Sequence, residues 1–176
     1  HHTASDGESL KIFLKDVLAL YSGQPLPPGG DRALHYAHFA EDTAARPQTD
    51  AARAAVDRAA DALSGATTVL ELPRGVNAEA AAAGSVQLHL SAADAAALRA
   101  FALAKGITAF SVLHAAYVAV LSQYAGKEDV LCGVATAGRP LPRHEATVGL
   151  FANLAVSRSR IGPEETFAGL IAQSAD

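Results

Sequence analysis

The chain has 176 residues, the length of one ordinary domain, and 50% of them are hydrophobic, which excludes a disordered chain. The formal charge is −4 and the basic residues are scattered, which excludes nucleic acid and other acidic polymers as partners. The single cysteine, Cys132, excludes an internal disulfide and favours a reducing, cytoplasmic compartment.

Three helices are predicted in the first part of the chain. Apolar residues recur at helical spacing from Leu10 to Tyr21 and predict an amphipathic helix that follows the opening residues. The Pro/Gly-rich stretch "GQPLPPGGD" is a connector. Two Ala-rich helices follow at about 32–46 and 50–63, and Pro47 ends the first of them.

Two strands are predicted in the middle of the chain. The stretch "TTVLELP" (67–73) indicates a strand ended by its proline, and 74–84 form a loop of low complexity. The stretch "SVQLHL" (85–90) alternates apolar and polar residues, the period of a half-buried strand. Its expected apolar face consists of Val86, Leu88 and Leu90.

Two further helices are delimited by their caps. Ser91 and Asp94 form a capping box that begins a helix, and Gly106 ends it. A second helix runs from about Thr108 to Tyr124 and is apolar nearly all round, so we expect it to be deeply buried. Its polar interruptions and amphipathic spacing argue against a membrane helix.

The last elements are two strands and a helix. The stretches 128–136 and 148–160 indicate strands, and Pro163 at a first helical turn predicts the final helix. The order of helices and strands is that of a mixed α/β fold.

The opening stretch "HHTASDG" carries the candidate site. Adjacent histidines are also typical of a purification tag, but a tag does not explain Asp6 and Gly7 directly before a helix. A neutral imidazole accepts a proton from an attacking amine or hydroxyl, and we assign this role to His2. The free N–H groups at the helix N-terminus are suited to stabilise an oxyanion, with Gly7 allowing close approach.

The same stretch resembles the HHxxxDG signature of condensation domains of nonribosomal peptide synthetases, a version of which occurs in the chloramphenicol acetyltransferase superfamily. Four later stretches resemble this family in order: the connector "GATTVLELPRG", the helix and strand "GITAFSVLHAAYVAVLSQYAGKEDVLCG", the strand "DVLCGVATAGRP" with its Gly-Arg pair, and "VGLFANL", similar to IGxFxNT. The resemblance implies an α/β, chloramphenicol acetyltransferase-like two-lobe sandwich.

The resemblance also implies how much of that fold the chain covers. The motif and first helix occupy 1–23, a connector with helices occupies 24–66, and most of the C-terminal lobe occupies 67–176. The N-terminal lobe and the final latch segment are not present in this sequence, which also has no Met. We therefore expect a fragment of a longer protein that is not a competent enzyme by itself.

Several residues take roles by this resemblance. His2 corresponds to the catalytic histidine, with His1 beside it in support, and Asp6 is expected to form a structural ion pair with Arg139. Asn153 is expected to line the substrate channel, although strand backbone bonding is nearly as good an interpretation. Two departures stand out: "YAHFAED" lacks the tryptophan of YxDYAxW, and Leu replaces the final Thr of IGxFxNT.

The activity implied by the resemblance is amide bond formation between a donor acyl thioester and an acceptor aminoacyl thioester, both held on carrier proteins. No cofactor of its own is implied, because phosphopantetheine arrives on the upstream and downstream peptidyl carrier proteins. An ester-forming or epimerising relative of the same fold remains an alternative, as does a non-catalytic domain that recruits carriers.

The remaining histidines and the cysteine give no second site. The spacing of these histidines matches no metal-ligand pattern and no second cysteine supports one, so no metal is predicted and surface or capping roles are expected for them. Cys132 lies in an apolar stretch, where an inert core thiol is expected.

Overall fold

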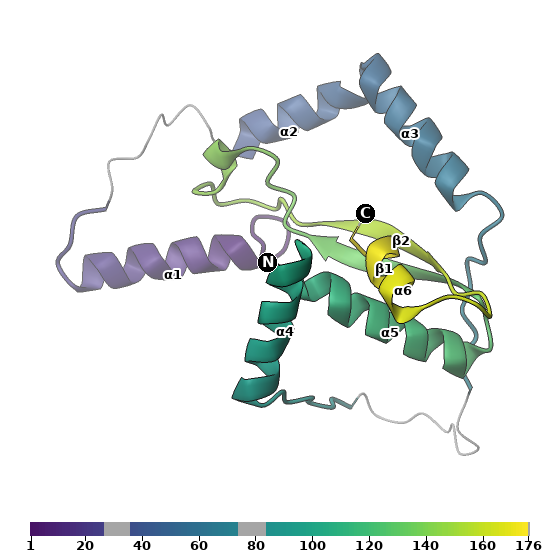
Figure 1. The fold of residues 1–176 in the computed structure, drawn as a ribbon. Helices are drawn as coiled ribbons and strands as arrows, with labels where there is room; N and C mark the ends of the chain where they lie inside the picture. Colours follow the sequence, from purple (N-terminus) through teal and green to yellow (C-terminus); the bar gives the residue numbers. More distant parts are fainter. Residues whose placement is uncertain (27–35, 74–83, 176) are drawn as a thin grey trace. The chain divides into compact units, whose positions relative to one another are not determined.

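The computed structural model describes residues 1–26, 36–73 and 84–175 (Figure 1). Within these ranges the chain forms helices and one two-stranded sheet. The helices are α1 (Gly7–Tyr21), α2 (Tyr36–Ala45), α3 (Asp50–Leu63), α4 (Ala92–Lys105), α5 (Ala109–Ala125) and α6 (Phe167–Gln173), with the 3-10 turns η1 (Arg46–Gln48) and η2 (Pro142–His144). The strands are β1 (Asp129–Thr136) and β2 (Asn153–Arg160).

The chain divides into two compact units that alternate along the sequence. Unit 1 comprises His1–Ser64 and Gly133–Ala155, and unit 2 comprises Gly65–Cys132 and Val156–Asp176. Unit 2 therefore begins close to the lobe boundary expected at residue 67, while the middle of the expected lobe belongs to unit 1. The lobe division itself stays a prediction.

The predicted helices are present where local signals define their ends. Asp6 caps α1, its carboxylate accepting the N–H of Ser9, and Ser91 caps α4 through the N–H of Asp94. Gly106 ends α4 in the left-handed conformation, at φ +67°, which a residue with a Cβ adopts only with strain. The first residues of the helix predicted at 32–46 and the loop predicted at 74–84, apart from residue 84, lie outside the described residues.

The two strands predicted in the middle of the chain are wrong. Residues 67–73 and 85–90 join no sheet, and the side chains of Val86 and Leu88 are 98% and 87% exposed. Alternation of apolar and polar residues matches the two faces of a strand, but a strand also needs an adjacent strand to which its backbone groups form hydrogen bonds. Within the described residues neither stretch has that neighbour.

The strand prediction for β1 is confirmed, and β2 is shorter than predicted. The two strands are antiparallel: the Thr136 hydroxyl donates to the Asn153 carbonyl at one end, and the Ile161 N–H donates to the Glu128 carbonyl at the other. Residues 148–152 stay outside the strand. The final helix also begins later than Pro163, because Thr166 caps α6.

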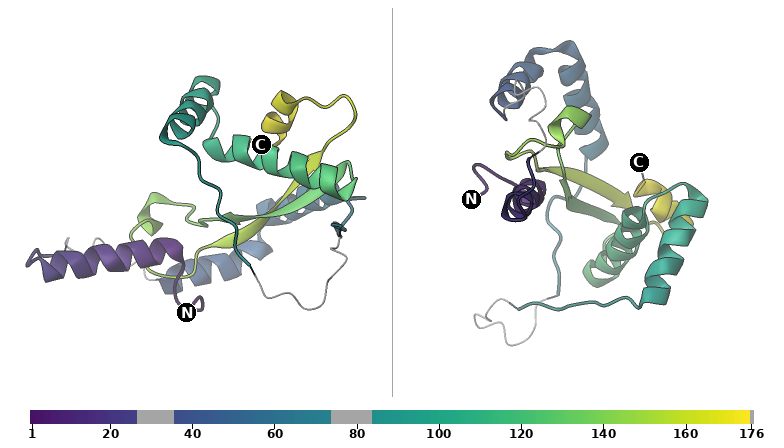
Figure 2. Two further views of the ribbon diagram at one scale, coloured as in Figure 1. Left: turned by 90° about the horizontal axis from the view of Figure 1, so that it is seen from below. Right: turned by 90° about the vertical axis from the view of Figure 1, so that its left-hand side faces the viewer.

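The core of unit 2 lies between α5, α6 and β1, and Figure 2 shows α5 and α6 side by side. Its buried residues are Ala115, Val118, Val130, Leu170 and Ile171. The expectation that the second long helix is deeply buried is wrong in part, because only one face of α5 packs against the core. The hydrophobic residues of its other face are exposed: Phe110, Leu113, Tyr117, Val120 and Tyr124.

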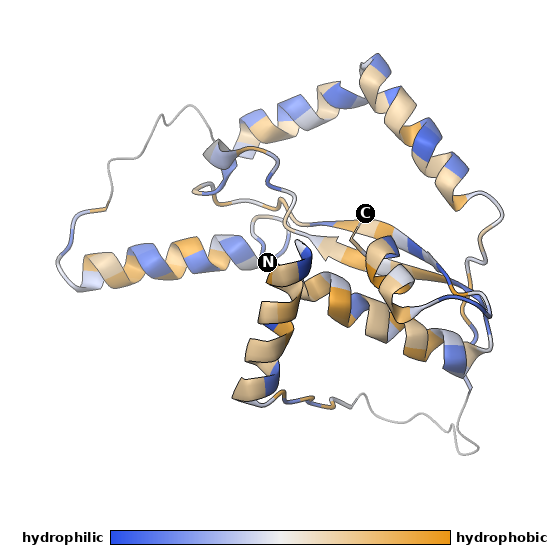
Figure 3. Cartoon of the chain, in the orientation of Figure 1, coloured by the Kyte–Doolittle hydropathy of each residue, from blue (hydrophilic) through white to orange (hydrophobic). Residues whose placement is uncertain are grey.

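Figure 3 shows how strongly hydrophobic α4 and α5 are. In the part of the chain that the structure describes, no single helix is long and apolar enough to cross a membrane. Taken together, α4 and α5 meet that test by length and composition, but they are bent by 106° where they join.

Candidate active site

The opening residues form a tight turn that gives the two histidines different hydrogen-bonding roles. Within it the Ala4 N–H and the Ser5 hydroxyl both donate to the His1 carbonyl, at 3.0 Å and 3.3 Å. The Thr3 N–H lies 3.2 Å from Nδ1 of His1, which therefore accepts. Nδ1 of His2 lies 3.2 Å from the Ser5 carbonyl, which can only accept, so this nitrogen carries the hydrogen. Nε2 of His2 is then the nitrogen with a free lone pair.

The Asp6 carboxylate is buried and accepts hydrogen bonds on both oxygens. Oδ1 receives the Ser9 N–H at 2.8 Å, the Ser9 hydroxyl at 2.7 Å and Nη2 of Arg139 at 3.0 Å. Oδ2 receives Nη1 of Arg139 at 2.9 Å and the N–H groups of Phe151 and Ala152 at 3.0 Å and 3.1 Å. The predicted ion pair between Asp6 and Arg139 is present, and these backbone bonds explain why β2 starts only at Asn153.

The hydrogen bonds keep this carboxylate ionised. Burial by itself raises the pKa of Asp6, but the bonds from Arg139, Ser9 and Phe151 outweigh burial and hold the pKa well below its usual range. The side chains of Arg139 and Asp6 are only 6% and 2% exposed. A buried charge of this kind is tolerated because it is paired and its remaining lone pairs are satisfied.

Arg139 is held by its surroundings as well as by Asp6. Its guanidinium carbon lies 4.4 Å above the centre of the Phe151 ring, a cation–π contact. The preceding Gly138 has φ +62°, and a Cβ there would collide with the Phe151 carbonyl. The glycine of "AGRP" is therefore required for the Arg139 segment to approach the Phe151 segment this closely.

An aromatic cluster packs beside the ion pair. The rings of Tyr36, Phe39, His144 and Phe151 contact one another with centre separations of 4.5 Å to 5.7 Å. The Tyr36 hydroxyl donates to the Leu150 carbonyl at 2.8 Å. The surface or capping role expected for His144 is wrong, because its side chain fills a gap between rings that lie far apart in the sequence.

His114 in unit 2 is buried as well, which also contradicts the expected surface role. Its ring stacks on Phe110 of the same helix, and its Nδ1 lies 3.0 Å from the Ser174 hydroxyl. Cys132, in β1, is half-buried, and burial raises the pKa of its thiol, so the thiolate is disfavoured.

Sequence reasoning missed Ser9, which is 1% exposed and contacts Asp6, Arg139 and Gly149. The available signal was its place three residues after a helix-capping Asp6, where side chain and cap commonly bond to each other. What no local signal indicates is its contact with Gly149, 140 positions away.

The other two predicted site residues are less constrained. Gly7 is the first residue of α1 and is exposed, and a Cβ there would meet nothing within 4 Å. Asn153 begins β2, and its side-chain oxygen accepts the Leu154 N–H at 2.8 Å. In the part of the chain that the structure describes, no hydrogen bond joins Asn153 to His1 or His2.

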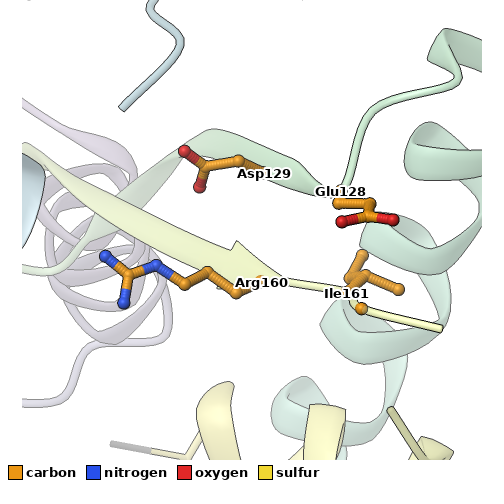
Figure 4. A pocket seen from close by; sticks show the side chains of 5 residues that line it. Glu128, Asp129, Arg160 and Ile161 are labelled. Atoms are coloured by element: carbon orange, nitrogen blue, oxygen red, sulfur yellow. The ribbon is translucent and has the colours of Figure 1, made fainter. Parts of the chain in front are cut away.

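A separate open hollow lies in unit 2 at the end of the sheet (Figure 4). Its lining consists of Glu128, Asp129, Arg160, Ile161 and Gly162. Nearby, Arg158 binds both oxygens of Asp129, at 2.8 Å and 2.7 Å, and this bond lowers the pKa of that carboxyl. None of the predicted site residues lines this hollow. Among the described residues, no three His, Cys, Asp or Glu side chains gather as metal ligands would.

Comparison with known proteins identifies the family. The family model described as "Condensation domain" matches residues 1–176. The chain belongs to the condensation-domain family. The family that the sequence resembles is thereby confirmed. Condensation domains are acyltransferases of nonribosomal peptide synthetases.

Relatives and solved structures agree with this assignment. Tyrocidine synthase 2 of Brevibacillus parabrevis is 33% identical over 170 residues, which are 95% of this condensation-domain chain and 5% of the synthase. SgcC5 from Streptomyces globisporus matches with a TM-score of 0.79 at 23% identity, over 99% of this chain and 40% of that one.

The first condensation domain of the CDA synthetase matches with a TM-score of 0.74 at 23% identity, over 99% of this chain and 39% of that one. These two structures show the fold, which is chloramphenicol acetyltransferase-like with mixed helices and sheet. The condensation-domain chain thus spans 40% or less of the first chains that it matches.

Proposed function

We propose that this condensation domain joins a donor acyl thioester to the amine of an acceptor aminoacyl thioester, with both substrates held on carrier proteins. The observation that carries the proposal is the hydrogen bond between Nδ1 of His2 and the Ser5 carbonyl, since it leaves Nε2 free to take a proton. His1 has the opposite arrangement, with Nδ1 as acceptor, and fits a supporting role as donor through Nε2.

The proposed reaction moves one proton from nitrogen to sulfur by way of His2 and needs no covalent enzyme intermediate. The acceptor amine attacks the carbonyl carbon of the donor thioester, a C–N bond forms, and the carbonyl oxygen takes the negative charge. Nε2 of His2 accepts the proton from the attacking nitrogen. When the intermediate collapses, the C–S bond breaks and the sulfur takes that proton and leaves as a thiol. The amide product remains on the acceptor carrier.

Gly7 is the candidate for stabilising the negative oxygen. The N–H groups of Ser9 and Leu10 at the start of α1 are already bound by Asp6, so an oxyanion at this helix end would use the N–H of Gly7 or of Glu8. The fold itself gives no steric reason for glycine here, because a Cβ would lie in open space. We infer that the glycine keeps this space clear for substrate. Asn153 would form part of the wall of the substrate channel.

The partners are proposed from the family. The phosphopantetheine arms enter as parts of the loaded carriers, one upstream and one downstream, and the domain needs no cofactor of its own. Tethering both substrates turns a bimolecular reaction into an oriented encounter. The relatives named for peptide products support a place in the biosynthesis of an antibiotic or other secondary metabolite, and the single cysteine fits a cytoplasmic setting.

The test uses the full-length protein that contains this chain, with a loaded donor carrier and a loaded acceptor carrier, and detects the product on the acceptor by mass. His2→Ala is expected to abolish amide formation, while His89→Ala, at an exposed histidine in unit 2, is expected to leave it unchanged. Normal turnover by His2→Ala would overturn the catalytic assignment.

Other products would identify the alternatives. An ester or an inverted α-carbon in place of an amide would favour an ester-forming or epimerising relative of the same fold. Carrier binding by the wild type without turnover would favour a domain that only recruits partners.

A further inference from the structure

The Ser9 hydroxyl is the most densely bonded side-chain group that the structure shows outside the ion pair itself. Oγ lies 2.7 Å from Oδ1 of Asp6 and 2.7 Å from the Gly149 carbonyl. It also lies 3.0 Å from the Gly149 N–H and 3.2 Å from Nη2 of Arg139. These partners are the residue that caps α1 and two residues that lie 130 and 140 positions farther along the chain.

The chemistry of a hydroxyl limits how these contacts are used. Oγ has one hydrogen and two lone pairs. The Gly149 N–H and the Arg139 guanidinium can only donate, so they fill the two lone pairs. The single hydrogen faces two acceptors at the same distance, Asp6 and the Gly149 carbonyl. Every bonding position of the hydroxyl is therefore engaged, which fixes Ser9 relative to all three partners.

Asp6 connects this bonded group to the proposed base. The Ser5 carbonyl and the Asp6 nitrogen belong to one planar peptide group, so a rotation of the Asp6 backbone also turns that carbonyl. The Ser5 carbonyl in turn accepts from Nδ1 of His2. If Asp6 rotates, the Ser5 carbonyl therefore turns with the shared peptide group, and its hydrogen bond to the imidazole of His2 changes.

We propose that Ser9 is a positioning residue for His2: its hydroxyl holds Asp6, and Asp6 aims the Ser5 carbonyl that places the hydrogen on Nδ1 of His2. The consequence for chemistry, a free lone pair on Nε2, rests on the proposed function. The inference that Ser9 positions His2 does not rest on the proposed function, since it concerns only which imidazole nitrogen carries the hydrogen. A purely structural serine would stabilise α1 and leave the imidazole unaffected.

The first readout is the tautomer of His2, measured from imidazole ¹⁵N chemical shifts at alkaline pH, with the signals assigned by comparison with His2→Ala. The wild type is expected to show His2 with the hydrogen on Nδ1. Ser9→Ala is expected to show a mixture of both tautomers, and Ser9→Thr, which keeps a hydroxyl, is expected to restore the wild-type spectrum. Ser91→Ala is the matched control, because Ser91 caps α4 with the same kind of bonds in unit 2.

The second readout is the rate of condensation by the full-length protein. Ser9→Ala is expected to lower kcat by about tenfold to 100-fold with little change in KM, as for residues that orient a reacting group. A folded Ser9→Ala variant that keeps the wild-type tautomer of His2 would overturn the proposal, whatever its kcat. If Ser9→Ala does not fold, Ser9→Cys, which keeps the size but donates weakly, decides by the same two readouts.

The two proposals fail separately. Normal turnover by His2→Ala would refute the base role, whereas the tautomer spectra would still decide whether Ser9 positions the ring. Conversely, an unchanged His2 spectrum in Ser9→Ala would refute the positioning role even if His2→Ala is inactive.

Discussion

Arg139 donates hydrogen bonds from both terminal nitrogens to the Asp6 carboxylate, Nη1 at 2.9 Å from Oδ2 and Nη2 at 3.0 Å from Oδ1. A pair of parallel bonds fixes the angle between the two groups as well as their separation. Since the same carboxylate also caps α1 and accepts from Phe151 and Ala152, it joins the helix start to the segment before β2.

Arg139→Ala is expected to destabilise the fold by about 3–5 kcal/mol, because it leaves the Asp6 charge buried without its main partner. The measurement is the free energy of unfolding in urea. Arg53→Ala is the matched control: its pair with Asp50 is 66% and 99% exposed and should cost only about 0.5 kcal/mol or less. Similar losses in the two variants would contradict a special contribution from the buried pair.

The pH dependence of stability should report the ionised Asp6. Its pKa is lower in the folded chain than the ordinary 3.8, so the unfolded chain binds the proton first. The stabilisation is full above the ordinary value and is lost as the pH falls below it toward the folded value. We expect the free energy of unfolding to fall more steeply below about pH 5 in the wild type than in Asp6→Asn.

Asp129 also has a lowered pKa and contributes to the same acid decline in both proteins, so the comparison isolates Asp6. Parallel pH profiles of the wild type and Asp6→Asn would show that the pKa of Asp6 is the same in the folded and unfolded chains, which would contradict its lowering by the hydrogen bonds of the folded state.

Gly7→Ala should separate stability from activity. Alanine is the better helix residue by up to about 1 kcal/mol, and here its Cβ meets nothing in the fold, so the midpoint of thermal unfolding should stay or rise. If the open space is needed by substrate, condensation should nevertheless slow. Unchanged turnover together with unchanged or raised stability would remove Gly7 from the candidate site.

Gly138→Ala should be costly for two reasons. The left-handed backbone conformation disfavours a Cβ by about 1–2 kcal/mol, and the collision with the Phe151 carbonyl adds about 1–3 kcal/mol. Gly162→Ala serves as the control, since its Cβ would meet nothing within 4 Å. The measurement is the free energy of unfolding of both variants by chemical denaturation. Equal values would contradict the close approach at Gly138.

Local sequence signals predicted the helices well because the groups that end a helix lie within a few residues of it. Ser91 with Asp94, and Gly106, act within a single turn of α4. The stretch 85–90 shows the opposite case. Its alternation is a true property of the sequence, but whether a strand forms depends on a neighbour that the alternation does not specify.

The candidate site shows the same contrast between local signals and contacts made with distant parts of the chain. The partnership of Asp6 with Arg139 was predictable from the family resemblance, and no spacing rule would have joined residues 133 positions apart. Ser9 and His144 were missed because their importance arises from burial against distant segments. Composition places such residues on the surface by default, and only the packed structure corrects this.

The distribution of donors around Asp6 also has a consequence for synthesis of the chain. Asp6 emerges from the ribosome 133 residues before Arg139 and 145 before Phe151. At bacterial and eukaryotic elongation rates, Arg139 therefore emerges about 7 to 27 s after Asp6. During that time the carboxylate remains hydrated and the start of α1 is held by local bonds alone. The start of α1 is therefore among the last parts of unit 1 to become fixed, and a chain interrupted before Arg139 would contain all of the opening stretch "HHTASDG" without the group that holds Asp6 in place.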